Sequence, residues 1–431
     1  MRSMLWLRVI RPFQVGVVVL CGALLLSSSH ELARDEQDRA RAYTRSIEFD
    51  YLAWMLDAGR VKVQAAAAGI PGYLGRVPSR IVVSDYLQIT GKIMRGEEAL
   101  NRVYADPAFS DKEAAASQIR ASLQVLKRRS QQLAPLAEGV LQDQVAQVIE
   151  DLGLAFFGQS MPPVLYHGTL VPDALIVSPR DEIRQSANIS IETDLPLEKQ
   201  VQLEQRVEQA MNASALVVPI GGVGVYPTMV MQTTDRHWLI STIAHEWTHN
   251  YLQLRPLGML YDHTPELRTM NETVADIMGA EIADEVMRRF YPGTTSADQA
   301  RADRISSPQR YPDPEDDDLP PFDFRSEMHT TRSTVDTLLA SGRIAEAEDY
   351  MERRRRTFLA HGYFIRRLNQ AYFAFYGAYA DMPGGPAGED PVGPAVRELR
   401  TESRSLADFL RRISWMTSFD ELQREITRGG R

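Results

Sequence analysis

The chain has 431 residues, of which 44% are hydrophobic and 24% charged, and its formal net charge is −9. A chain of this length usually forms two or three domains, and this apolar content is enough to build real cores. The acidic balance argues against nucleic acid as a partner. The single cysteine, Cys21, excludes an internal disulfide framework and a cysteine-ligated zinc site in the globular part.

The first 29 residues have the order of a targeting segment. Arginines at positions 2, 8 and 11 precede an apolar stretch at 13–26, and serines and an acidic run follow. This is the order of a secretory signal peptide. Counted back to Met4, the stretch is also long enough for an uncleaved membrane anchor, which we favour because no A-x-A cleavage site follows. In either case the positive-inside rule places the bulk of the chain outside the cytoplasm, which fits a bacterial envelope.

Residues 30–160 are expected to form a helical region. Apolar residues recur at intervals of three and four among charges at 35–59, 85–104 and 111–154. Long antiparallel helices beside an anchor suggest a stalk or a cover that faces the substrate, and plain structural packing is the alternative. No chemistry is visible in this part of the sequence.

Strand patterns begin after residue 160. Clusters of β-branched residues at 174–178, 187–192 and 215–220 predict strands, and the pattern at 197–211 predicts a helix between them. Gly222 and Gly224 follow, without the third glycine and the strand-to-helix context of a dinucleotide-binding loop.

The run His245-Glu246-Trp247-Thr248-His249 is the most informative feature of the sequence. Positions i and i+4 of a helix lie on one face, so a helix at 235–250 would let both histidines hold one zinc ion. Glu246 would then lie beside the open position of the metal. The alternative is an ordinary pair of histidines on a surface or core helix.

A second run, Asn271 to Asp276, offers the third ligand that a catalytic zinc needs. Pro256, Gly258 and Pro265 end the first helix and turn the chain back, so a second helix at 271–290 can bring Glu272 to the metal. Asp276 lies one turn later on the same face and is expected to accept the spare ring N–H of a ligand histidine, His245. An ordinary helix start with Asn271 as N-cap is the alternative.

The two runs together resemble the gluzincin metallopeptidases, the thermolysin-like group with the pattern HExxH followed by NExx(A/S)D. The resemblance covers about residues 215–290 and implies that His245, His249 and Glu272 are zinc ligands, that Glu246 is the general base, and that Asp276 orients a ligand. No metzincin pattern follows the first helix. The Gly-Ala-Met-Glu-Asn signature of related aminopeptidases is also absent, so exo- and endopeptidase action both stay open.

The resemblance also suggests where a substrate binds. In zincins the strand before the metal helix often lies along the cleft as an exposed edge, to which an extended peptide adds by main-chain hydrogen bonds. Gly222 and Gly224 fit that reading or a bulged hairpin. Gluzincins usually have a Tyr, His or Arg from the C-terminal subdomain that assists the oxyanion. Tyr372, Tyr376 and His361 are the candidates here, and aromatic packing is the alternative.

The remainder of the chain divides into a loop and a helical part. Residues 299–325 are rich in Pro, Asp and Ser and predict a solvated acidic loop, without the spacing of an EF-hand. Helical patterns return at 326–340, 344–361, 364–380 and 406–413, before a short final helix. The arginine run at 353–356 lies among glutamates and is interpreted as a solvated helix face.

Taken together, the sequence predicts an α+β, predominantly helical fold. A zincin-like catalytic domain at 161–298, made of a small sheet and the HExxH helix, is expected between helical regions at 30–160 and 326–431. The predicted function is a zinc-dependent metallopeptidase that uses Glu246 as general base on peptide or protein substrates outside the cytoplasm. The alternatives are a zinc site with other hydrolytic chemistry, and an envelope interaction protein in which zinc only joins two helices.

Overall fold

The fold is taken from a computed structural model, which describes residues 35–68, 75–105, 112–156, 158–193, 195–292, 322–361, 363, 365–377 and 391–429. The predicted anchor or signal at 1–29 lies outside these residues, and so does nearly all of the predicted acidic loop at 299–325. Within the described ranges, no helix combines the length and the apolarity that crossing a membrane requires.

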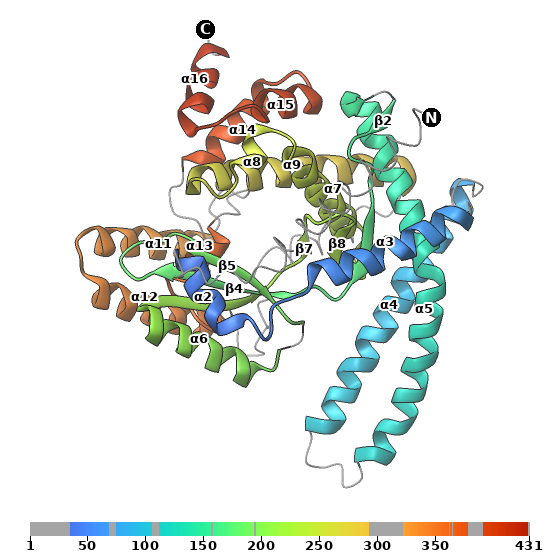
Figure 1. The fold of residues 1–431 in the computed structure, drawn as a ribbon, viewed down its shortest axis with the longest axis horizontal. Coiled ribbons are helices and arrows are strands. Elements are labelled where there is room, and N and C mark those ends of the chain that lie inside the picture. The colour runs from blue at the N-terminus through green and yellow to red at the C-terminus, as the bar shows by residue number, and fades with distance from the viewer. Residues whose placement is uncertain are drawn as a thin grey trace, which may run out of the picture.

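Helices dominate the N-terminal part. Helices α2 (Glu36–Thr44) and α3 (Tyr51–Ala68) are followed by α4 (Arg76–Ala105) and α5 (Lys112–Ile149), and a single π-helical turn (Glu150–Leu154) ends the series. Figure 1 shows α4 and α5 side by side as a long hairpin that projects from the rest of the molecule.

The strands form two small three-stranded sheets and one short hairpin within the described residues. In the first sheet, β3 (Tyr166–Thr169) pairs in parallel with β8 (Thr228–Met231), and β7 (Gly222–Val223) pairs antiparallel on the other side of β8. The second sheet is antiparallel, with β4 (Asp173–Pro179) between β5 (Ala187–Ile191) and β6 (Ala213–Pro219). Helix α6 (Leu197–Met211) connects β5 to β6, and β1 (Ala155–Phe156) pairs with β2 (Gln159–Ser160).

Three large hydrophobic clusters of the described residues hold these elements together, and a small fourth one packs α4 against α5. The largest joins α4 and α5 to α7 (Arg236–Leu252), α9 (Pro265–Phe290), α14 (Val392–Glu402), α15 (Leu406–Ile413) and α16 (Phe419–Gly429). The second covers one face of the β5-β4-β6 sheet with α11 (Phe324–Ala340), α12 (Ile344–Ala360) and α13 (Gln370–Tyr376), and the third covers the opposite face with α2 and α6. Fully burying a large apolar side chain contributes about 1.5–3 kcal/mol, so these clusters fix the layers.

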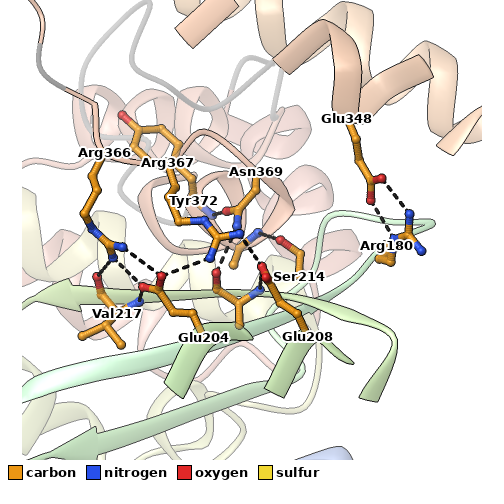
Figure 2. Close-up of polar contacts among 12 residues, drawn as sticks. Arg180, Glu204, Glu208, Ser214, Val217, Glu348, Arg366, Arg367, Asn369 and Tyr372 are labelled. Carbon is orange, nitrogen blue, oxygen red and sulfur yellow. Dashed lines mark hydrogen bonds and ion pairs between the residues drawn. The ribbon is translucent and has the colours of Figure 1, made fainter. Parts of the chain in front are cut away.

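An ion-pair network holds the segment that leads into α13 on this sheet (Figure 2). The fully buried carboxylate of Glu204, on α6, pairs with both Arg366 and Arg367. Asn369 caps α13, because its side-chain oxygen accepts a hydrogen bond from the backbone N–H of Tyr372 at 2.9 Å. A buried carboxylate that lost its cations would destabilise the fold by several kcal/mol, roughly 3–5, so this network fixes the position of α13.

The predominantly helical α+β fold predicted from the sequence is confirmed. Helices α6 and α15 have the predicted bounds. The stretch with a helical pattern at 35–59 forms helix, but with an interruption between α2 and α3. Here α2 ends at Thr44, and the N–H of Phe49 donates to the carbonyl of Ser190 at 3.1 Å, while Ile47 accepts from Glu192 at 2.8 Å. This backbone extends the β5 edge and therefore cannot stay helical.

Two further helix predictions need correction in the C-terminal part. The helix predicted at 364–380 begins only at Gln370, because the preceding Asn369 is its N-cap. Helix α14 was not predicted, although it buries Val396 and Leu399 in the largest cluster. Its short length and the proline within its first turn weaken the periodic signal in the sequence.

Candidate metal centre

Helix α7 carries the HExxH run and lies in the middle of the largest cluster. Its N-cap is Asp235, whose Oδ1 accepts a hydrogen bond from the backbone N–H of Trp238 at 2.9 Å. Because the two histidines are one turn apart, their rings lie together, with centroids 4.7 Å apart in an edge-to-face arrangement. Ile243 before the site, Trp247 within it and Leu252 after it are buried in this cluster, so the helix is packed on both sides of the site.

Helix α9 carries the second run and packs along α7. It begins at Pro265, with Thr264 as N-cap, and not at Asn271 as the sequence predicted. The two helices cross closely at Gly279, where a Cβ atom would lie 2.8 Å from the backbone oxygen of Ser241. This close crossing brings Glu272 opposite the two histidines.

Three ligand atoms converge between the two helices. The Nε2 atoms of His245 and His249 are 3.0 Å apart, and each lies 3.5 Å from Oε2 of Glu272. Ligands bound about 2.0–2.1 Å from a tetrahedral zinc are separated from one another by about 3.3–3.4 Å. Oε2 of Glu272 is buried and makes no hydrogen bond. Two imidazoles and one carboxylate at this spacing therefore fit a divalent metal such as zinc.

Neighbouring side chains set the orientation of both rings. Nδ1 of His245 lies 2.8 Å from Oδ1 of Asp276, which is the contact expected from the sequence. Nδ1 of His249 lies 2.8 Å from Oδ1 of Asn271, whose amide in turn donates to the carbonyl of Leu257 at 3.2 Å. Acceptors at both Nδ1 atoms keep the protons there and leave the Nε2 lone pairs directed at the metal position.

Tyr261 is a member of the site that the sequence analysis missed. It follows the short helix α8 (Pro256–Met259), and its hydroxyl donates to Oε1 of Glu272. With Oε1 bound in this way, Oε2 is the oxygen that faces the histidines. A tyrosine in a connecting segment has no periodic or motif signal, so only the fold reveals this role.

Glu246 lies beside the three ligand atoms and against β7. A Cβ atom on Gly222 would lie 2.7 Å from Oε1 of Glu246, and one on Gly224 would lie 3.4 Å from Oε2 and 3.2 Å from Cβ of His249. The sequence indicated an exposed edge or a bulged hairpin at these glycines, and in the structure the carboxylate of Glu246 approaches them closely. No hydrogen bond or ion pair to this carboxylate is formed by the residues that the structure describes, so it is available to a water molecule or a substrate.

Tyr51 is a second residue without a sequence signal. It begins α3, and its hydroxyl donates to Oγ of Ser190, on β5, at 2.7 Å. Burial raises the pKa of Tyr51, the bond to Ser190 opposes that shift, and the negative charge of Glu246 adds to it. The N-terminal helical region therefore brings a phenol within electrostatic range of the proposed base.

The charges of the cluster shift the pKa of each member. Burial alone would lower the pKa values of the two histidines, but Asp276 raises that of His245 well above its ordinary value, and Glu272 raises that of His249. Burial would raise the pKa of Glu272, but the histidines hold it well below its ordinary value. Burial raises the pKa of Glu246. A metal ion that binds here must displace protons from the histidines.

The tyrosines proposed from the resemblance lie in another part of the fold. Tyr372 and Tyr376 are on α13 in the second hydrophobic cluster, with ring centroids 4.6 Å apart, and burial raises the pKa of both. His361 stacks on Phe322 at 4.0 Å. In the part of the chain that the structure describes, no hydrogen bond, ion pair or ring contact joins any of these three to the ligand cluster. Helix α13 reaches α9 through Arg268, whose Nη2 donates to a backbone carbonyl of α13 at 3.0 Å.

No protein-family model, no curated protein and no solved structure matches this chain. The resemblance to gluzincins is therefore one of motif residues and their spacing. Function has to be inferred from the geometry of the site itself.

Proposed function

We propose that this protein is a zinc-dependent metallopeptidase with a zincin-like catalytic region, acting outside the cytoplasm on peptide or protein substrates. One observation carries the proposal: three converging ligand atoms lie beside the carboxylate of Glu246, which has no partner among the described residues. Structural zinc sites have four protein ligands, whereas catalytic sites have three and keep one position open. His245, His249 and Glu272 provide the three ligands of a catalytic site, and Glu246 provides a carboxylate that does not bind the metal.

Each residue of the site has a distinct part in peptide hydrolysis. Zinc held by His245, His249 and Glu272 would supply a Lewis acid that polarises the peptide carbonyl and acidifies a water molecule. Glu246 accepts a proton from the attacking water as the C–O bond forms, and delivers it to the leaving amine as the C–N bond breaks. Its raised pKa supports this exchange near neutral pH. Asp276 keeps His245 in the tautomer that binds metal.

A hydrogen-bond donor for the developing oxyanion completes this mechanism. The sequence resemblance favoured Tyr372 and Tyr376, which lie in the α13 cluster. Tyr51 is supported instead by its electrostatic coupling to Glu246 and by the bond that holds its hydroxyl to Ser190. We therefore propose Tyr51 as the oxyanion donor, which would exchange its contact with Ser190 for one with the substrate oxygen.

The edge strand β7 supports an extended peptide as the substrate. It pairs with β8 on one side, and no other strand of the described chain pairs with it on the other side. Gly222, in this strand, lies against Glu246. A peptide added along such an edge by main-chain hydrogen bonds would lie next to the proposed base.

The test measures zinc content and peptide hydrolysis on the same samples of wild type, His249→Ala, Glu246→Gln and a control, His237→Ala. His237 is on the same helix but pairs with Asp284 at 2.9 Å, so its loss should leave zinc and activity in place. We expect His249→Ala to lose zinc, and Glu246→Gln to keep zinc and lose nearly all turnover. Zinc without hydrolysis in the wild type would favour an interaction protein with a structural metal, and absence of zinc would refute the proposal.

A further inference from the structure

A hollow of about 510 Å³ lies between α4 and the start of α7. It is distinct from the metal centre, because Arg236 is the first residue of α7 and His245 follows nine positions later, about 13 Å along the helix axis. Its volume is in the range of about 300–1,000 Å³ typical of small-molecule sites.

The lining of this hollow is cationic and rich in hydrogen-bond donors. It combines two guanidinium groups, one ammonium group, two hydroxyls and one amide, and none of its lining residues is acidic. The residues that provide these groups are Arg95, Arg236, Lys92, Ser84, Thr234 and Gln88. In a chain with a net charge of −9, this hollow concentrates positive charge, and a cleft lined by one sign of charge attracts ions of the opposite sign.

Among the residues that the structure describes, the three cations have no carboxylate partner. Many arginines of this chain form bidentate ion pairs, such as Arg180 with Glu348 and Arg400 with Glu281. Lys92, Arg95 and Arg236 form no ion pair with any residue in the described ranges. The described carboxylates therefore do not offset their mutual repulsion, and a bound anion would relieve it.

Arg236 is held in place toward this hollow. Its Nη2 donates to Oγ of Ser84 at 3.1 Å, and its guanidinium lies 4.4 Å from the ring centroid of Tyr291. Its Nε is buried and has no hydrogen-bond partner. The guanidinium is thus a fixed cation, and little further side-chain entropy is lost when it binds a ligand.

Gly91 shapes the floor of the hollow. A Cβ atom there would lie 3.0 Å from Cγ2 of Thr234 and 3.4 Å from Nη1 of Arg95. The absence of a side chain lets the segment before α7 approach α4, so that the Thr234 side chain and the Arg95 guanidinium face each other across the glycine.

We propose that this hollow binds a phosphate ester. A phosphate group carries up to two negative charges and presents several acceptor oxygens, which match the guanidinium forks, the ammonium group and the hydroxyls. The volume exceeds what one inorganic phosphate fills, so the ester carries an organic part. That ester is either a soluble metabolite or the headgroup of a phospholipid.

The test measures binding of glycerol 3-phosphate to the full chain by isothermal titration calorimetry. Glycerol is the uncharged reference ligand. The variant Lys92→Glu/Arg95→Glu reverses two exposed charges in the hollow. The control Arg128→Glu/Arg129→Glu makes the same charge change on exposed residues of α5 outside it. Gln88→Glu is a second variant, which adds one negative charge and removes no cation.

We expect wild type and the α5 control to bind glycerol 3-phosphate, and both hollow variants to bind at least about tenfold more weakly, as the loss of one charge-assisted hydrogen bond would produce. Lack of binding by the wild type, or equal weakening by the hollow variant and the control, would overturn the proposal. Sedimentation with vesicles of phosphatidylcholine, with and without phosphatidic acid, identifies the source. Variant-sensitive binding to the acidic vesicles assigns a lipid headgroup, and its absence assigns a soluble ester.

Discussion

Replacing Gly222 by alanine is the sharpest test of how the proposed base is positioned. The added Cβ would lie 2.7 Å from Oε1 of Glu246, a separation that real Cβ atoms essentially never show. Ordinary contact begins near 3.4 Å, so the carboxylate must move by several tenths of an ångström. The backbone of Gly222 is outside the left-handed region, so alanine itself introduces no backbone strain.

The expected consequence is a loss of turnover without a loss of metal. A misplacement of about 1 Å in a reacting group can cost about 100-fold in rate, so a shift of more than half that size predicts a kcat lower by about 10- to 100-fold. Because the clash is with the end of a flexible side chain, stability should change by less than about 1 kcal/mol. The assay measures kcat and KM for a peptide substrate, zinc content and thermal unfolding of the same preparation.

Gly59→Ala is the matched control, since a Cβ at that position meets no atom within 4 Å. It should leave kcat and zinc content unchanged. Wild-type kcat in Gly222→Ala would show that the position of the Glu246 carboxylate does not limit catalysis, and the assignment of Glu246 as general base would then be refuted. Loss of zinc in that variant would instead show that β7 supports the ligands.

Three further outcomes are expected. Asp276→Ala should weaken zinc affinity by about 10- to 100-fold, because His245 loses the acceptor that fixes its tautomer, and titration against a competing chelator measures this. Zinc affinity should fall as pH decreases, and the fall should start above the ordinary histidine pKa of about 6.5. Both ligand histidines have raised pKa values, and a protonated histidine must lose its proton before it binds zinc. Calorimetry at several pH values checks whether zinc binding releases protons. Tyr51→Phe should lower kcat by about 10- to 100-fold at unchanged zinc content, whereas Tyr376→Phe should not, and the reverse result would restore the assignment that the sequence resemblance favoured.

The contacts between residues of one helix are the part of the site that could be predicted from the sequence. His245 and His249 share a helix face at i and i+4, and Asp276 follows Glu272 by one turn, so each pair lies together wherever the helix forms. The contact between Asp276 and His245 needed only the further assumption that the two helices meet. Helical periodicity likewise gave the bounds of α6.

Contacts between distant segments could not be predicted in this way. Tyr51 is brought to the region of Glu246 because Phe49 pairs with the β5 edge, which interrupts a stretch whose pattern is helical. The early start of α9 did have a local signal, Thr264 as N-cap and Pro265 in the first turn, but the proline was interpreted only as the end of the preceding helix. Tyr261 has no such signal.

The same geometry favours the proposed catalytic centre over a metal that only joins two helices. A structural site would be complete with a fourth protein ligand, and the described residues that converge within ligand distance are His245, His249 and Glu272. A joining role also gives no reason for Glu246 to be buried beside the metal position without a partner among the described residues, since leaving a carboxylate in that state costs stability. Gly222 leaves room for that carboxylate. A buried carboxylate that the fold accommodates beside the three ligand residues supports the proposed hydrolysis.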